Sequence, residues 1–146
     1  MTHRLNDAAI ACSLRRMRLS LIALVLLLDT AALPAQALDL NGFRKANGLK
    51  PMRAHATLAA LATAHAAGMA RRQSMDHAGF FTQRAPRGAS GENVSVGCAN
   101  TGCAILQWSN SPPHRANMLR PDFTRYGLAS AASASGQRYW ALEFGR

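Results

Sequence analysis

The stretch GENVSVGCANTGCAILQWSNSPPHRANML, residues 91–119, changes its hydrophobic period partway along. Its first part, ENVSV, alternates valine with polar residues, which is typical of a half-buried strand. The pattern then becomes helical, with Ile105, Leu106 and Trp108 as the large apolar residues. We expect this helix to end at residues 111–113, Ser-Pro-Pro, because neither proline has an N–H to donate. One further helical turn is expected at HRANML.

The segments before this stretch predict helices and a loop. Residues 56–73 give the clearest helical pattern, with Leu58, Leu61, Ala62, His65 and Met69 on one stripe. His65 lies within that stripe, so we interpret it as a core histidine rather than a ligand. A short helix is expected near Leu40, with Gly48 as its stop. Residues 74–90 predict a loop, because Gly, Pro, Ser and Asp are frequent there.

The segments after this stretch predict a hairpin. Residues 124–133 and 137–145 are expected to form two strands, joined at Ser135-Gly136. Alternation in the second strand places Trp140, Leu142 and Phe144 on one face and Tyr139, Ala141 and Glu143 on the other. The whole pattern predicts an α+β fold in which helices cover a mostly antiparallel sheet.

The first 37 residues have the composition of a secretory signal peptide. Three arginines precede an apolar run, and Ala35-Gln36-Ala37 offers a cleavage site. Asp29 and Pro34 interrupt the run, so a lasting membrane span is the weaker alternative. A start at Met17 would give a more compact signal, which makes residues 1–16 a candidate extension of the gene model. We expect one mature domain over 38–146, in the periplasm or outside the cell.

Charge and cysteines limit the partners of that domain. After residue 37 there are 13 basic and 5 acidic residues, a net charge of about +8, which favours anionic lipid or envelope polymers as partners. No motif indicates nucleic acid, and we expect a monomer. Cys98 and Cys103 suit a disulfide in an oxidising compartment, with two reduced thiols as the alternative.

Several motifs occur in an order that resembles a known family. They are NxxRxxxGLxP from Asn41 to Pro51, DH at His77, GEN at Glu92, WxxSPxHRxNML from Trp108, and a final YWxxxFG. This order over residues 39–146 is similar to the CAP superfamily of cysteine-rich secretory proteins, antigen five and plant pathogenesis-related proteins, and to its short bacterial members in particular. The resemblance implies an α-β-α sandwich with a central antiparallel sheet.

The resemblance also implies a cleft lined by two histidines and two glutamates, in which the histidines hold a divalent metal such as zinc. His77, Glu92 and His114 match three of these positions. The second glutamate position falls on Ser111, so this sequence departs from the pattern. Glu143 is a candidate replacement, at a position where short bacterial members often carry glutamine. We include Asn93 and Ser111 in the predicted cleft, with Asn93 also interpreted as a backbone partner.

The chemistry of His77, Glu92 and His114 allows three interpretations. The three side chains could hydrogen-bond one another and pin loops together, since buried polar groups need partners. The two imidazoles could instead bind a metal weakly in an open, half-hydrated site. Thirdly, Glu92 could act as a catalytic base.

These interpretations give three functional hypotheses. We favour an exported binding protein whose cleft takes a lipid, an envelope polymer or a protein. A metal-assisted hydrolase or peptidase that uses the same three residues is the second, since proteolysis has been proposed for some relatives. A structural interaction module is the third. Binding is favoured over catalysis because the chain has an export signal, a basic surface and an incomplete set of the four cleft residues, and because a fold does not fix a function.

Overall fold

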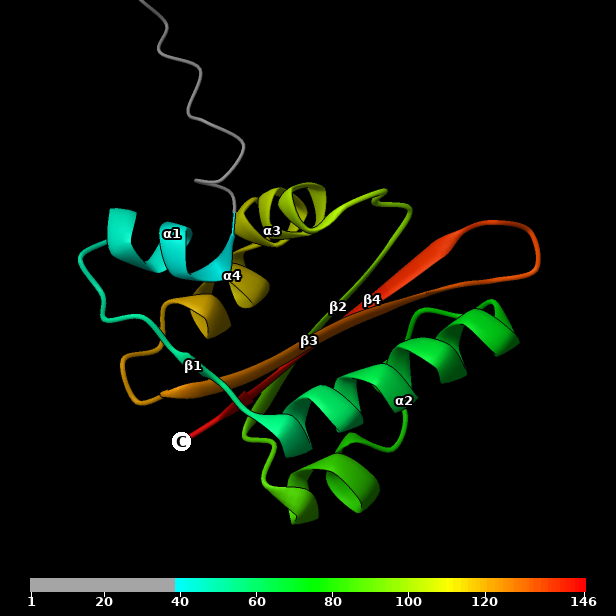
Figure 1. Cartoon of the computed structure of the whole chain (residues 1–146), viewed down its shortest axis with the longest axis horizontal. Coiled ribbons are helices and arrows are strands. Elements are labelled where there is room, and N and C mark those ends of the chain that lie inside the picture. The colour runs from blue at the N-terminus through cyan, green and yellow to red at the C-terminus, as the bar shows by residue number, and fades with distance from the viewer. Residues whose placement is uncertain (1–38) are drawn as a thin grey trace, which may run out of the picture. The chain divides into compact units, whose positions relative to one another are not determined.

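The computed structural model describes residues 39–146, so the predicted signal peptide lies outside the described residues. The described part has a four-stranded sheet with helices on both faces (Figure 1). Helix α2 (Ala56–Arg72) lies along one face. Helices α1 (Leu40–Ala46), α3 (Thr101–Ser109) and α4 (Pro112–Met118) cover the other. The predicted α-β-α sandwich is confirmed.

The sheet has the order β1-β3-β4-β2. Strand β4 (Arg138–Gly145) pairs in the antiparallel direction with both β3 (Arg125–Ala132) and β2 (Gly91–Val96), so the sheet is mostly antiparallel, as predicted. The sequence did not predict β1 (Arg53–Ala54), which adds in parallel to β3. A strand of two residues has no alternation to detect, and it is held by its partner alone.

Alternation along β4 divides the core in two, as predicted. Trp140, Leu142 and Phe144 face the layer of α1, α3 and α4, where they pack with Trp108. Tyr139 and Ala141 face α2 instead and meet its alanine-rich stripe. Because the alanine side chains of this stripe are small, α2 lies close to the sheet. Gly127 on β3 marks the closest approach, because a Cβ there would lie 2.1 Å from the backbone nitrogen of Ala59.

The opening motif holds the start of the domain in place through polar side chains. The Asn41 side chain accepts from Met52 N and donates to its carbonyl, at 2.8 and 3.0 Å. Arg44 is 2% exposed, and burial lowers the pKa of its guanidinium. It donates to carbonyls from two segments, at Lys50, Met118, Arg120 and Phe123. One buried cation therefore ties α1 to the loop that follows it and to the segment between the end of α4 and β3.

Two predictions of local structure need correction. Residues 74–90 are not loop throughout, because a π-helical turn, η2 (Phe80–Arg84), and a 3₁₀ turn, η3 (Ala85–Arg87), occupy the middle. Turns this short show no sustained period in a sequence. The proline pair Pro112-Pro113 begins α4 rather than ending α3, which stops at Ser109. Proline suits the first turn of a helix because N–H groups there lack intrahelical partners.

Candidate functional site

The candidate site starts from an imidazole–carboxylate pair at the outer strand of the sheet. His77 lies in the segment after α2, and its Nδ1 is 2.7 Å from Glu92 Oε1 on β2. The His77 side chain is 54% exposed, whereas the Glu92 side chain is 2% exposed. The buried carboxylate therefore accepts a hydrogen bond from Nδ1–H of His77. This leaves the lone pair of Nε2 available for a ligand.

A buried arginine that the sequence analysis missed holds Glu92. Arg84 on η2 is 4% exposed, with its Nε 2.5 Å from Glu92 Oε2 and its Nη2 3.0 Å from Oε1. The same guanidinium donates to the carbonyls of Ala78 and His77. Arg84 thus fixes both the carboxylate and the segment that carries the imidazole. Its only signal in the sequence is its place between two glycines, which is too weak to distinguish it from the surface arginines.

A second carboxyl group faces Glu92 across the strand pair. Glu143 on β4 is the register partner of Glu92, so the two side chains share the face toward α2. Glu143 is completely buried, with Oε1 3.1 Å from Arg84 Nε. Burial, and then the hydrogen bond and charge of Glu92, raise the pKa of Glu143 to about 9. At neutral pH Glu143 is therefore a neutral acid.

The two glutamates differ in charge because their surroundings differ. Burial alone would raise the pKa of Glu92, but hydrogen bonds from Glu143, Arg84 and His77 outweigh burial, so the pKa of Glu92 is lowered. His65 on α2 adds to this, with Nε2 3.7 Å from Glu92 Oε1. Its Nε2 is also 2.9 Å from the Asp76 carbonyl, and burial lowers the pKa of His65. His65 is buried, as predicted, but it packs against the site.

The second predicted histidine approaches from the other helical layer. The His114 ring on α4 lies with its centre 6.5 Å from that of His77, at an interplanar angle of 47°. Burial, and then the charge of His77, lower the pKa of His114. A neutral His114 is the form that binds metals and accepts hydrogen bonds.

Asn93 lies behind the site rather than within it. Its side chain is completely buried, and its amide donates to the His114 carbonyl at 2.9 Å. Asn117 donates to Asn93 Oδ1 and to the Glu92 carbonyl. Trp108 Nε1 donates a hydrogen bond to a second carbonyl of β2, that of Val94. These side chains hold α4 against β2 and occupy the carbonyl groups of the outer strand edge, which blunts pairing with another strand.

Two neighbouring hollows flank the histidines. His77 and Glu92 line one of about 320 Å³, together with Phe80 and Phe81. His114 lines another of about 210 Å³, and Ser111 lies beside it at the N-terminus of α4. Four of the predicted cleft residues therefore line a hollow, His77 and Glu92 in one and His114 and Ser111 in the other, whereas Asn93 lines neither.

The two histidines provide donors suited to a weakly held divalent metal. Imidazoles that share one tetrahedral zinc bring their ring centres to about 5 Å, so the His77 and His114 rings would have to approach by about 1.5 Å. The Glu92–His77 contact is the outer-shell arrangement that orients a metal-binding histidine. Within residues 39–146, no group of three or more His, Cys, Asp or Glu side chains is placed to surround one ion. Water would complete such a site.

The predicted disulfide is present. Cys98 and Cys103 are bonded across the start of α3, where Asn100 accepts from Cys103 N at 3.0 Å. The Cys98 carbonyl also accepts from Trp140 Nε1 at 2.8 Å. The short loop is therefore fixed both to its own helix and to the sheet core.

The fold and a sequence comparison together define the class of the protein. Residues 39–144 match the profile of CAP, the Cysteine-rich secretory protein family, and the chain belongs to this family. The uncharacterized protein YkwD of Bacillus subtilis is 31% identical in an alignment over 113 residues, which covers 71% of this chain and 43% of YkwD. The chain thus spans less than half the length of that relative.

Solved structures share the fold. An outer surface protein of Borrelia burgdorferi aligns with a TM-score of 0.62 at 18% identity, over 73% of this chain and 86% of that one. An extracellular protein of Bacillus anthracis that contains an SCP domain aligns with a TM-score of 0.55 at 24% identity, over 76% and 39%. Proteins with CAP domains are typically extracellular. Within residues 39–146, no helix is both long and apolar enough to cross a membrane.

Proposed function

We propose that this chain is an exported CAP domain that binds an amphiphilic envelope ligand, with a lipid as the first candidate, at the edge where His77 and His114 line two hollows. The observation that carries the proposal is the 2.7 Å contact between His77 Nδ1 and Glu92 Oε1, which aims Nε2 of an exposed imidazole outward. A divalent metal such as zinc, shared by the two imidazoles, would give the ligand head group a Lewis-acidic partner.

The surroundings of His77 support an amphiphile. Phe81, which lines the same hollow, is 85% exposed, and Met75 beside the second hollow is 47% exposed. Large apolar side chains placed openly beside polar groups mark binding surfaces. A ligand with a polar head and an apolar body would contact both kinds of group.

The burial and hydrogen bonds of Glu92 favour binding over hydrolysis. A general base must reach the proton that it removes, at hydrogen-bond distance or through one water. Both oxygens of Glu92 are already engaged by His77 and Arg84, and its side chain is 2% exposed. Glu143, as a neutral buried acid, is also not a base. The carboxyl groups therefore suit a scaffold for the imidazole.

The metal step is tested by titrating zinc into metal-free protein in a calorimeter. We expect one weak site in the wild type and its loss in both His77→Ala and His114→Ala. His55→Ala is the matched control, because that histidine lies at the start of α2, apart from the candidate site. Equal heat from the wild type and the two site variants would refute the metal site.

The amphiphile step is tested with oleate, measured with and without zinc. Phe81→Ala should weaken oleate binding, whereas Leu106→Ala, which removes an apolar side chain that is 50% exposed on α3, should not. Equal effects of the two variants would argue against a site beside His77. Zinc-dependent peptide cleavage that disappears in Glu92→Gln would instead favour the hydrolase hypothesis.

A further inference from the structure

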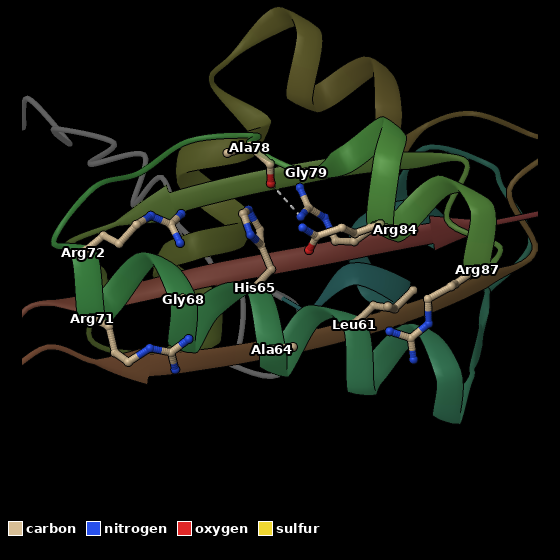
Figure 2. A pocket seen from close by; sticks show the side chains of 11 residues that line it. Leu61, Ala64, His65, Gly68, Arg71, Arg72, Ala78, Gly79, Arg84 and Arg87 are labelled. Atoms are coloured by element: carbon tan, nitrogen blue, oxygen red, sulfur yellow. Dashed lines mark hydrogen bonds between the residues drawn. The ribbon is translucent and has the colours of Figure 1, made fainter.

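A third concave surface lies between α2 and the segment after it, and none of its lining residues lines the hollows beside His77 and His114. A groove of about 360 Å³ runs between α2 and the segment that contains η2 and η3. Figure 2 shows Arg71 and Arg72 on either side of Gly68 at one end, and Arg87 beside Leu61 at the other. Four of the eleven lining residues are arginines, and none is acidic.

These arginines are not equally neutralised. Arg84 is committed to Glu92 and Glu143, and Arg72 Nη2 lies 3.1 Å from both oxygens of Asp76. Arg71 and Arg87 are exposed and form no ion pair with any carboxylate of residues 39–146. The groove therefore keeps positive charge at both of its ends.

Glycine at position 68 makes the groove deep at its arginine-rich end. A Cβ on Gly68 would lie 3.1 Å from Arg72 Nη1 and 3.9 Å from Arg71 Nη2. The two guanidinium groups thus converge over bare helix backbone. Asp76 pairs with Arg72 but not with Arg71, so positive charge remains at this end, and an anion between the two arginines would be attracted to it.

The length and chemistry of the groove indicate the ligand. Leu61 and Arg71 are ten residues apart on one helix, which is about 15 Å. A single small anion cannot reach both ends, but a chain with repeated negative groups can. Guanidinium groups bind phosphate through paired, charge-assisted hydrogen bonds, and phosphate has enough acceptor oxygens for two guanidinium groups at once.

We propose that the groove between α2 and η2–η3 binds the phosphate groups of a linear phosphate-bearing ligand, with one phosphate between Arg71 and Arg72 and another at Arg87. This site is distinct from the site at His77. The two share only a wall, because Arg84 and His65 line the groove on one side and meet Glu92 on the other. The proposal therefore does not depend on metal binding or on the amphiphile.

The experiment titrates inorganic phosphate and short linear polyphosphate into the folded protein at low salt, followed by calorimetry. Polyphosphate should bind more tightly than phosphate, because it reaches both ends. Arg71→Gln and Arg87→Gln should each weaken polyphosphate binding by about tenfold. Arg53→Gln is the matched control, because it removes the same charge from an exposed arginine on β1. Equal weakening by all three variants, or no binding by the wild type, would overturn the proposal.

Two further variants test the shape of the groove and its charge separately. Gly68→Leu keeps the net charge, suits a helix and fills the floor of the groove, so polyphosphate binding should be lost while the melting curve stays cooperative. Asp76→Asn keeps an oxygen that can accept from Ala78 N, but it releases Arg72, so affinity should rise. Unchanged affinity in Gly68→Leu would show that bulk charge, and not the groove, binds the anion.

The source of the phosphate is then separated with vesicles. Phosphatidylglycerol in phosphatidylcholine vesicles presents anionic phosphodiesters on a surface, whereas polyphosphate presents anhydride-linked phosphates along a free chain. Vesicle binding that falls in Arg71→Gln and Arg87→Gln but not in Arg53→Gln would assign the groove to lipid head groups. Binding of the free chain alone, with the same variant pattern, would assign it to a soluble polymer. Either pattern supports the phosphate site.

Discussion

The substitution Glu143→Gln should stabilise the protein, and the gain should grow with pH. The folded state holds a proton on Glu143 up to about pH 9, whereas the unfolded chain releases it near the ordinary value of 4.5. Between these values the unfolded state binds fewer protons, so the free energy of unfolding falls as pH rises. Glutamine has nearly the shape of the protonated acid, can donate to Glu92 in the same way, and has no proton to lose.

The magnitude follows from the same values. The folded state still holds the proton at pH 7, which is about 2.5 units above the pKa of 4.5 in the unfolded chain. Each unit is worth about 1.4 kcal/mol, so Glu143→Gln should be more stable than the wild type by about 3 kcal/mol at pH 7. The difference should vanish below pH 4.5, where both states hold the proton. His65 and His114 act in the opposite direction, because their lowered pKa values give stability that is lost as pH falls below about 6.5. Both proteins contain them, so their contribution cancels in the difference.

The assay is urea unfolding of wild type and Glu143→Gln at a series of pH values, with linear extrapolation to water. Glu92→Gln is the contrasting control, since the lowered pKa of Glu92 contributes stability above pH 4.5, and this variant should be less stable at pH 7. A gain for Glu143→Gln that is the same at pH 4 and pH 8, or a loss at pH 7, would refute the assignment of a neutral acid at this position.

Three further substitutions test the packing that positions the site. Gly127→Ala should cost about 3 kcal/mol or prevent folding, because the added methyl meets helix backbone at 2.1 Å, and an unchanged thermal melt would contradict this close approach. Arg44→Leu should cost about 3 kcal/mol in urea unfolding, since several carbonyls lose their buried donor, and a neutral effect would show that water replaces the guanidinium. Replacing both Cys98 and Cys103 by serine should lower stability by only about 2 kcal/mol, because the closed loop is short, whereas loss of folding would assign the bond a larger role.

The sequence by itself predicted the regular elements and the layers that they form. The stripe of Leu58, Leu61 and Met69 specifies a helix with one buried face, and the alternation of Trp140, Leu142 and Phe144 specifies a strand between two layers. These patterns are local, because one period repeated along one segment decides which face leaves water. The spacing of the two cysteines is equally local, and the predicted bond formed.

Only the tertiary structure decided which charges meet inside the site. Glu143 faces Glu92 because of the register of β4 on β2, and Arg84 reaches both because a π-helical turn aims it inward. No repeat in the sequence encodes either contact, since their energies depend on burial and on groups far apart along the chain. A glutamate and an arginine that composition would place on the surface are therefore buried together, and burial and Glu92 keep that glutamate protonated.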